Sequence, residues 1–331
     1  MSRLTDRLRG RYRRLDEADI ERGTAIILEE TDPRLRLVSG HRRKLRKPVV
    51  RSLAYTGGLV TRIPGPFEIS RRAYGNDPQV NALFASADDI DTLFGRSRAL
   101  QQFFRDHPGS DRVYVPLAMR REKKRIMGMT LSGDIVRRDV VRTAVNFSGH
   151  RLGVVLSGSE AELRRALVWR GIHNLAVTAL ENITRLKGAT AALEQQRTLL
   201  QMKLRDIKAQ HPGLEGLAED APGGEQQQAL RHHLEDTARQ LEAARTGLST
   251  LADYLAQVCR VFNHPSRYLQ VRPGSVRVDR MGIVPDDFSE GPGEEIRSAT
   301  VTVGDQPPFE VVLATFGRAE MSDVDTADML R

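Results

Sequence analysis

Apolar residues in the second half of the chain recur at alternating steps of four and three from Leu230 to Phe262. This spacing is the heptad pattern of a helix that packs lengthwise against other helices. We therefore predict one continuous helix that His264-Pro265 terminates. The positions that would face the partner helix are called the seam. On this helix they are Leu230, Leu234, Thr237, Leu241, Ala244, Leu248, Leu251, Leu255, Val258 and Phe262.

A long helix is also expected before this one. Ser159 and Glu162 form the S-x-x-E capping-box pattern, which indicates a helix start, and the helical pattern continues to about Gln210. Polar Thr190 and Arg197 make its seam weaker than the later one. Residues 211–224 form a polar loop, so the two helices are predicted to fold back over 159–264 as an antiparallel coiled-coil hairpin. The main seam positions on the first helix are Ile172, Ala179, Leu186, Leu193, Leu200 and Ile207.

The first 110 residues are expected to form a basic helical domain. An Arg-rich helix is predicted over residues 2–22 and ends at Gly23, and another runs from Pro48 to Ile63. Asp77-Pro78 is a strong helix start, because a capping acid precedes a proline, and helical spacing continues from there to about residue 107.

The remaining segments, 111–158 and 265–331, carry β-like patterns. We expect three or four short strands within 112–156, and later strands at 268–271, 276–278, 299–303 and 310–314. Because a hairpin returns the chain to its starting point, the strands before and after it should be neighbours. The predicted fold class is α+β, mainly α, with the coiled-coil hairpin projecting from a mixed α/β head that the acidic C-terminal segment completes.

Composition favours a cytoplasmic protein of bacterial type. The single cysteine, Cys259, excludes an internal disulfide bond. No apolar run reaches the roughly 18 residues of a transmembrane helix, and no apolar core follows the N-terminus as in a secretory signal.

Positive charge is concentrated in the front of the chain. Residues 1–150 hold 30 Lys and Arg against 18 Asp and Glu, whereas residues 266–331 hold 7 against 12. Two dense basic clusters could neutralise phosphates on nucleic acid or on an anionic membrane surface, although ordinary solvated surface is the alternative. These anion-binding candidates are Arg42, Arg43, Lys44, Arg46 and Lys47, and then Arg120, Arg121, Lys123, Lys124 and Arg125.

The second cluster also carries an R-x-x-x-R spacing from Arg121 to Arg125, followed by Asn146-Phe147-Ser148. This pair of motifs resembles the PilZ domain, whose R-x-x-x-R and [D/N]-x-S-x-x-G motifs imply binding of cyclic di-GMP on a small β-barrel. The resemblance covers about 36 of 331 residues, and Arg151 stands where the motif has its glycine.

Residues that could bind a metal or act in catalysis are not spaced as in any known metal-binding or catalytic motif. His232 and His233 are adjacent and point to different helix faces, so they do not suit one metal ion. Phosphate-binding glycine loops and a nucleophile elbow are missing from the sequence. We expect no metal, no cofactor and no enzymatic activity. The sequence favours a coiled-coil adaptor or scaffold that associates with protein and forms homo-oligomers. The alternatives are a protein that binds nucleic acid or an anionic surface and a PilZ-like sensor.

Overall fold

A computed structural model describes residues 16–132, 135–210, 224–245, 250–285 and 293–322. The fold is mixed α/β, as the sequence predicted at this level, and it contains one long helix and a curled antiparallel sheet. Contacts divide the chain into two compact units. We call them the α/β unit, with residues 52–174 and 265 onward, and the helical unit, with residues 16–51 and 175–264.

Within the described residues, no helix combines the length and the apolar character needed to cross a membrane.

The sheet of the α/β unit has the strand order β3-β2-β6-β5-β4, and the short strand β1 pairs in parallel with β6. Its strands are β1 (Phe67–Glu68), β2 (Arg112–Ser132), β3 (Ile135–Leu152), β4 (Leu269–Val278), β5 (Glu294–Val303) and β6 (Phe309–Gly317). Pairing of β2 with β6 confirms that strands before and after the long helices are neighbours.

The expected short strands within 112–156 are wrong, since the structure has one long β2–β3 hairpin there. The predicted strands at 268–271 and 276–278 are likewise one strand, β4. It continues through Pro273, which an edge strand tolerates because one of its sides has no ladder to complete.

Two features curl the sheet around its inner face. A register shift between β2 and β3 falls where Gly149 adopts a φ of 62°, a left-handed conformation that suits a β-bulge. The turn after β4 then meets the free edge of β3, since Val145 N–H donates to Gly282 at 2.8 Å and Val284 N–H donates to Thr143 at 2.8 Å.

Short helices cover the inner face and complete its core. They are α4 (Arg71–Asn76), α5 (Pro78–Leu83), α6 (Ala87–Ile90), the π-helical turn η2 (Asp91–Gly95) and α7 (Arg98–Asp106). Asp77 caps α5 by accepting the Gln79 N–H at 2.9 Å, which confirms the predicted start. Phe94 and Phe316 stack at 5.2 Å between ring centroids in this core.

Two helices supply the other face of the sheet, α3 (His41–Val60) and α8 (Glu160–Gln210). β6 is buried at successive positions, so both sheet faces are covered. The buried Arg164 guanidinium donates to the Val60 carbonyl at 2.8 Å and to the Gly65 carbonyl at 3.2 Å, which closes the end of α3. Ser159 caps α8 as predicted, but α3 begins seven residues before the predicted Pro48.

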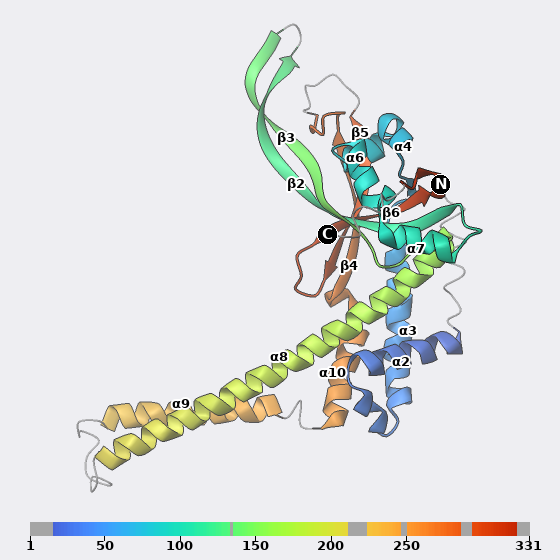
Figure 1. The fold of residues 1–331 in the computed structure, drawn as a ribbon. Helices are drawn as coiled ribbons and strands as arrows, with labels where there is room; N and C mark the ends of the chain where they lie inside the picture. The colour runs from blue at the N-terminus through green and yellow to red at the C-terminus, as the bar shows by residue number, and fades with distance from the viewer. Residues whose placement is uncertain (1–15, 133–134, 211–223, 246–249, 286–292, 323–331) are drawn as a thin grey trace, which may run out of the picture. The chain divides into compact units, whose positions relative to one another are not determined.

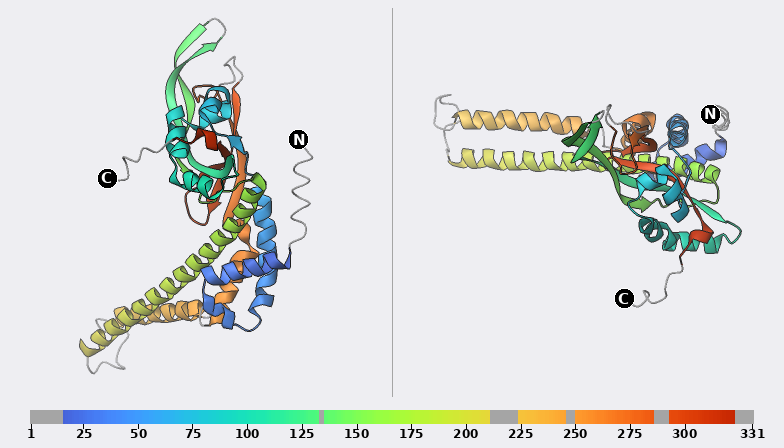
Figure 2. Two further views of the ribbon diagram at one scale, coloured as in Figure 1. Left: turned by 45° about the vertical axis from the view of Figure 1, so that its right-hand side comes forward. Right: turned by 90° about the horizontal axis from the view of Figure 1, so that it is seen from above.

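The helical unit gathers α2 (Glu17–Glu30), the 3-10 turn η1 (Pro33–Leu37), the first half of α3, the later part of α8, α9 (Gly224–Arg245) and α10 (Leu251–Asn263). Residues 2–15 of the helix predicted over 2–22 lie outside the described residues, and Gly23 is buried inside α2 rather than at its end. The described residues do not show the antiparallel coiled-coil hairpin that was predicted over 159–264, and Figure 2 draws α8 and α9 as separate helices. Residues 211–223 of the loop predicted over 211–224 lie outside the described residues, and Gly224 is the first residue of α9.

The single helix predicted from Leu230 to Phe262 is wrong. The structure has α9 and α10, and a capping box starts α10, because the Asp253 N–H donates to Thr250 Oγ1 at 3.2 Å and the Thr250 N–H donates to Asp253 Oδ2 at 2.8 Å. A side chain that satisfies free N–H groups defines a helix start, and heptad spacing continues across such a break without revealing it.

Candidate functional site

The two predicted basic clusters lie on different elements, one on α3 in the helical unit and one on β2 in the α/β unit. All five basic side chains on α3 are exposed, and they surround the buried Leu45 and Pro48. Arg46 is held by Glu17 of α2, with one contact of 2.7 Å between Nη2 and Oε2. This cluster is therefore a solvated helix surface with one of its charges paired.

Strand pairing sorts the β2 cluster onto two faces of the hairpin. Directly opposite residues of antiparallel strands share a face, and neighbours along a strand alternate. Arg120 lies opposite Ser148 and Lys124 opposite Ala144, so both basic residues share one face. The other face carries Arg121, Lys123 and Arg125, opposite Phe147, Val145 and Thr143.

Arg121 anchors the base of the hairpin. Its Nη2 lies 3.3 Å from Oε1 of Glu310, whose carboxylate is buried on β6. The same carboxylate accepts hydrogen bonds from Ser298 at 2.6 Å and Thr300 at 2.9 Å. A buried carboxylate needs such partners, so Arg121 has a structural role and is not available to an external anion.

His150 is a second anchor, and no pattern in the sequence pointed to it. Its ring stacks on Phe84 with 4.8 Å between centroids, and its Nε2 lies 2.7 Å from the Leu83 carbonyl oxygen. Burial lowers the pKa of His150, although the contact with Leu83 and the charge of Asp89 act in the opposite direction. The ring fixes the end of α5 against β3.

Three basic side chains of the β2 cluster remain available to a partner, and a fourth, Lys124, is weakly paired. Lys124 is 3.8 Å from Glu122, which also accepts the Ser148 hydroxyl at 3.0 Å. Arg120, Lys123 and Arg125 are exposed and form no ion pair with any described acidic residue. Figure 1 shows the outer part of β2 and β3 extending beyond the rest of the sheet.

The geometry separates the two motifs that resemble PilZ. Glu122 pairs with Asn146, and Arg120 with Ser148, so Asn146 and Ser148 share the face opposite to that of Arg121 and Arg125. Arg121 is bound to Glu310 and Ser148 to Glu122. The two motifs therefore form no common pocket.

A cavity of about 240 Å³ opens at the turn between α4 and α5, and β4 and β5 form its other wall. Two of the three acidic side chains that line it accept hydrogen bonds from backbone N–H groups. Asp77 caps α5, and Asp279 accepts the N–H groups of Met281 at 2.8 Å and Ile283 at 2.9 Å. Among the described side chains, no group of three His, Cys, Asp or Glu could hold a metal ion.

The predicted seam positions differ in burial. Thr237, Leu241, Leu255, Val258 and Phe262 are buried. Half-buried positions are Leu193, Leu200, Leu230, Leu234 and Leu251, whereas Leu186 is 39% exposed. The Ile207 side chain and Leu248 lie outside the described parts.

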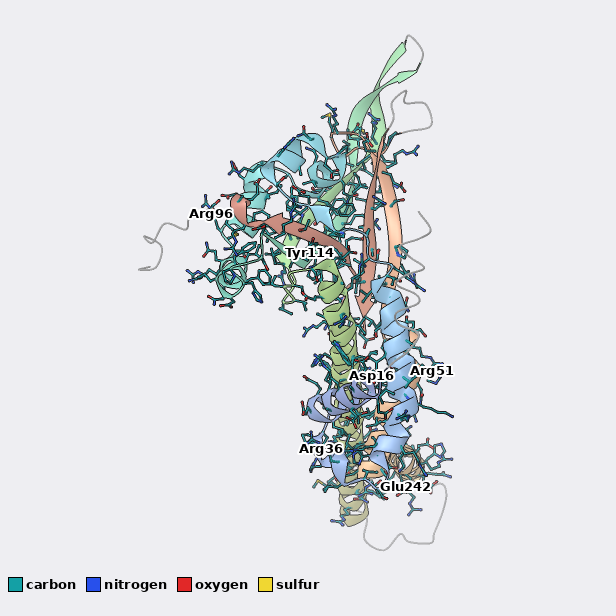
Figure 3. The ribbon with its side chains drawn as sticks, turned by 90° about the vertical axis from the view of Figure 1, so that its right-hand side faces the viewer. Asp16, Arg36, Arg51, Arg96, Tyr114 and Glu242 are labelled. Atoms are coloured by element: carbon teal, nitrogen blue, oxygen red, sulfur yellow. The ribbon has the colours of Figure 1, made fainter. Side chains whose placement is uncertain are left out.

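An apolar stripe on α8 was not recognised in the sequence. It consists of Val177, Leu180, Leu199 and Met202, which are 41%, 38%, 59% and 54% exposed. At about 100° per residue these four positions fall within roughly 100° of each other, on the side opposite to Leu186. Figure 3 shows side chains of the helical unit, in which Arg36 and Glu242 are labelled.

Comparison with protein-family models finds no matching family for this chain. Comparisons with curated proteins and with solved structures also find no match.

Proposed function

We propose that the protein is a non-enzymatic adaptor or scaffold that associates, copy to copy, through the helical unit. The apolar stripe on α8 carries this proposal. Of the ten large apolar side chains that are exposed among the described residues, five lie on α8. Exposed apolar side chains that share one side of a helix are typical of an association site, because covering them removes apolar area from water.

A coiled-coil hairpin of α8 and α9 would present this stripe. The seam side chains Thr237 and Leu241 of α9 are 3% and 1% exposed, while Leu230 and Leu234 are half-buried. This burial supports packing of the α9 seam against α8. If one side of α8 is covered by α9, the stripe on its other side stays available to a second copy.

Cross-linking of mixed isotopic copies tests this association. Full-length chains labelled with ¹⁵N are mixed with unlabelled chains, and a lysine cross-linker is added. We expect heavy-to-light cross-links at Lys187 and Lys203, which lie on α8. If α8 gives only cross-links within one copy, the stripe is not the association surface.

Binding of anionic surfaces is a second candidate function, favoured by the unpaired basic side chains Arg120, Lys123 and Arg125 on the protruding hairpin. Clustered cations on a projecting element can reach phosphates without a pocket. Fluorescence anisotropy with a DNA duplex, and sedimentation with anionic vesicles, should detect binding at about 50 mM salt, where screening is weak. Lack of binding to both ligands would reject this candidate.

A further inference from the structure

The outer part of the β2–β3 hairpin is a free two-stranded ribbon. Beyond Met119, which lies opposite Glu310, β2 pairs only with β3 among the described residues. The turn that contains Gly282 covers the edge of β3 at Thr143 and Val145, and the ribbon continues past it from Arg125 to Ser132. At about 3.3 Å per residue this free portion is roughly 25 Å long.

Cations lie on both faces of the ribbon near its base. Arg120 and Lys124 occupy one face, and Lys123 and Arg125 occupy the other. Residues 120–142 hold eight Lys and Arg against three Asp and Glu. Apolar Met127 and Val141 lie opposite each other farther out and are 70% and 54% exposed. A partner that meets only one face would leave the cations of the other face unused.

We propose that this ribbon docks in the major groove of B-form DNA, an inference that rests on the anion-binding function proposed above. The major groove, about 12 Å wide, admits a two-stranded β-ribbon, whereas the minor groove, about 6 Å wide, is too narrow. Phosphates line both walls of the groove. Long basic side chains on both faces of the ribbon can therefore reach the phosphates while the ribbon between them meets base edges.

The residue types on the ribbon argue against other anionic partners. Single strands are bound by aromatic side chains that stack on bases, and no Phe, Tyr or Trp occurs from Val115 to Asn146. The major groove of an RNA duplex is too deep and narrow for side chains to read. A lipid surface is flat and would contact the cations of one face only.

A duplex with a filled major groove tests the docking directly. Affinity of the full chain is measured by anisotropy for two duplexes of one sequence, one with cytosine and one with glucosylated 5-hydroxymethylcytosine, which blocks the major groove without changing the charge. We expect binding to the blocked duplex to be about tenfold weaker or more, since contacts with base edges are lost. Equal affinity for both duplexes would overturn the major-groove assignment and leave DNA binding intact.

Charge variants then assign the binding to the ribbon. The pair Arg120→Gln and Lys124→Gln, and the pair Lys123→Gln and Arg125→Gln, should each flatten the salt dependence of DNA affinity by about two units. The matched control Arg98→Gln with Arg105→Gln removes the same charge from exposed positions on α7 and should leave the salt slope unchanged.

Other outcomes separate this inference from the function on which it rests. If a variant of Arg42 and Arg43 on α3 loses DNA affinity and the ribbon variants do not, DNA binding stands and the ribbon assignment is wrong. Equal affinity for single strands, or binding to anionic vesicles without binding to DNA, would also overturn the inference. If neither DNA nor vesicles bind, the anion-binding function fails together with it.

Discussion

The apolar side chains of strand β6 are buried, whereas those on the distal part of α8 are exposed. On β6, Val312, Leu313 and Phe316 are at most 1% exposed, because layers of helix cover both faces of the sheet. On α8, Leu199 and Met202 are more than half exposed. The α/β unit therefore completes its core within one chain, whereas the helical unit leaves apolar surface that a partner can cover.

Part of the helical unit buries its apolar side chains. Ala176, Ala179 and Ile183 of α8 are buried, as are Val258 and Phe262 of α10. Burial on α8 thus falls along the helix within one unit. We propose that the buried proximal side chains stabilise the unit and that the exposed side chains of the stripe are the surface for association.

The largest effect should come from the core of the α/β unit. Phe94 is fully buried between Phe84 and Phe316, so Phe94→Ala should lower the free energy of unfolding by about 3–5 kcal/mol. Leu199→Ala should change the stability of the monomer by less than about 0.5 kcal/mol, as expected for an exposed position. Urea unfolding at low protein concentration measures both. Equal losses would remove the distinction between the two regions.

A smaller effect is expected at the break between α9 and α10. Thr250→Ala removes the cap of α10 and should cost about 1 kcal/mol, with faster amide exchange in the first turn of that helix. Thr198→Ala is the matched control, since the Thr198 hydroxyl bonds only the Glu194 carbonyl within α8, at 2.9 Å. Unchanged exchange in the Thr250 variant would mean that the break does not depend on this cap.

The smallest effect is a pH dependence in the α/β unit. A hydrogen bond from the Ser322 hydroxyl holds the pKa of Asp91 below its ordinary value of 3.8, against the opposing effect of burial, and hydrogen bonding and charge from Arg96 add to the lowering. The ionised carboxylate therefore stabilises the fold above the unfolded-state pKa, and this contribution is lost as the pH falls through the lower folded-state pKa.

Thermal unfolding from pH 6 to pH 2.5 measures this contribution. Asp91→Asn should melt below the wild type at pH 6, and the two melting temperatures should converge as the pH falls below about 3.8. Asp88→Asn, at an exposed position of α6, is the control. A constant difference across this range would show that the charge of Asp91 does not stabilise the fold.

Local signals in the sequence predicted several features correctly. Asp77-Pro78 and Ser159 mark helix starts, because caps act on the nearest N–H groups. The strands around the long helices pair as expected. The long β2–β3 hairpin was missed, since Gly128 and the polar run from Arg120 to Arg125 look like interruptions when cross-strand pairing is unknown.

The site was predictable only in part. Charge runs pointed to Arg120–Arg125, but strand alternation and the buried partner of Arg121 depend on register and on Glu310, which is distant in sequence. Heptad spacing revealed the Leu241 seam and concealed both the break at Thr250 and the second apolar stripe on α8. Burial is a tertiary property that spacing alone does not determine.

Sedimentation equilibrium at micromolar concentration tests most directly whether copies associate through α8. The wild-type chain should show the mass of a dimer or a higher oligomer, and Leu199→Glu with Met202→Glu should reduce it to the 37.0 kDa monomer, because charges within an apolar contact lack partners. The control Gln196→Glu with Gln201→Glu adds the same charge to α8 outside the stripe and should remain oligomeric. A monomeric wild type, or an oligomer that survives the stripe variant, would contradict the account.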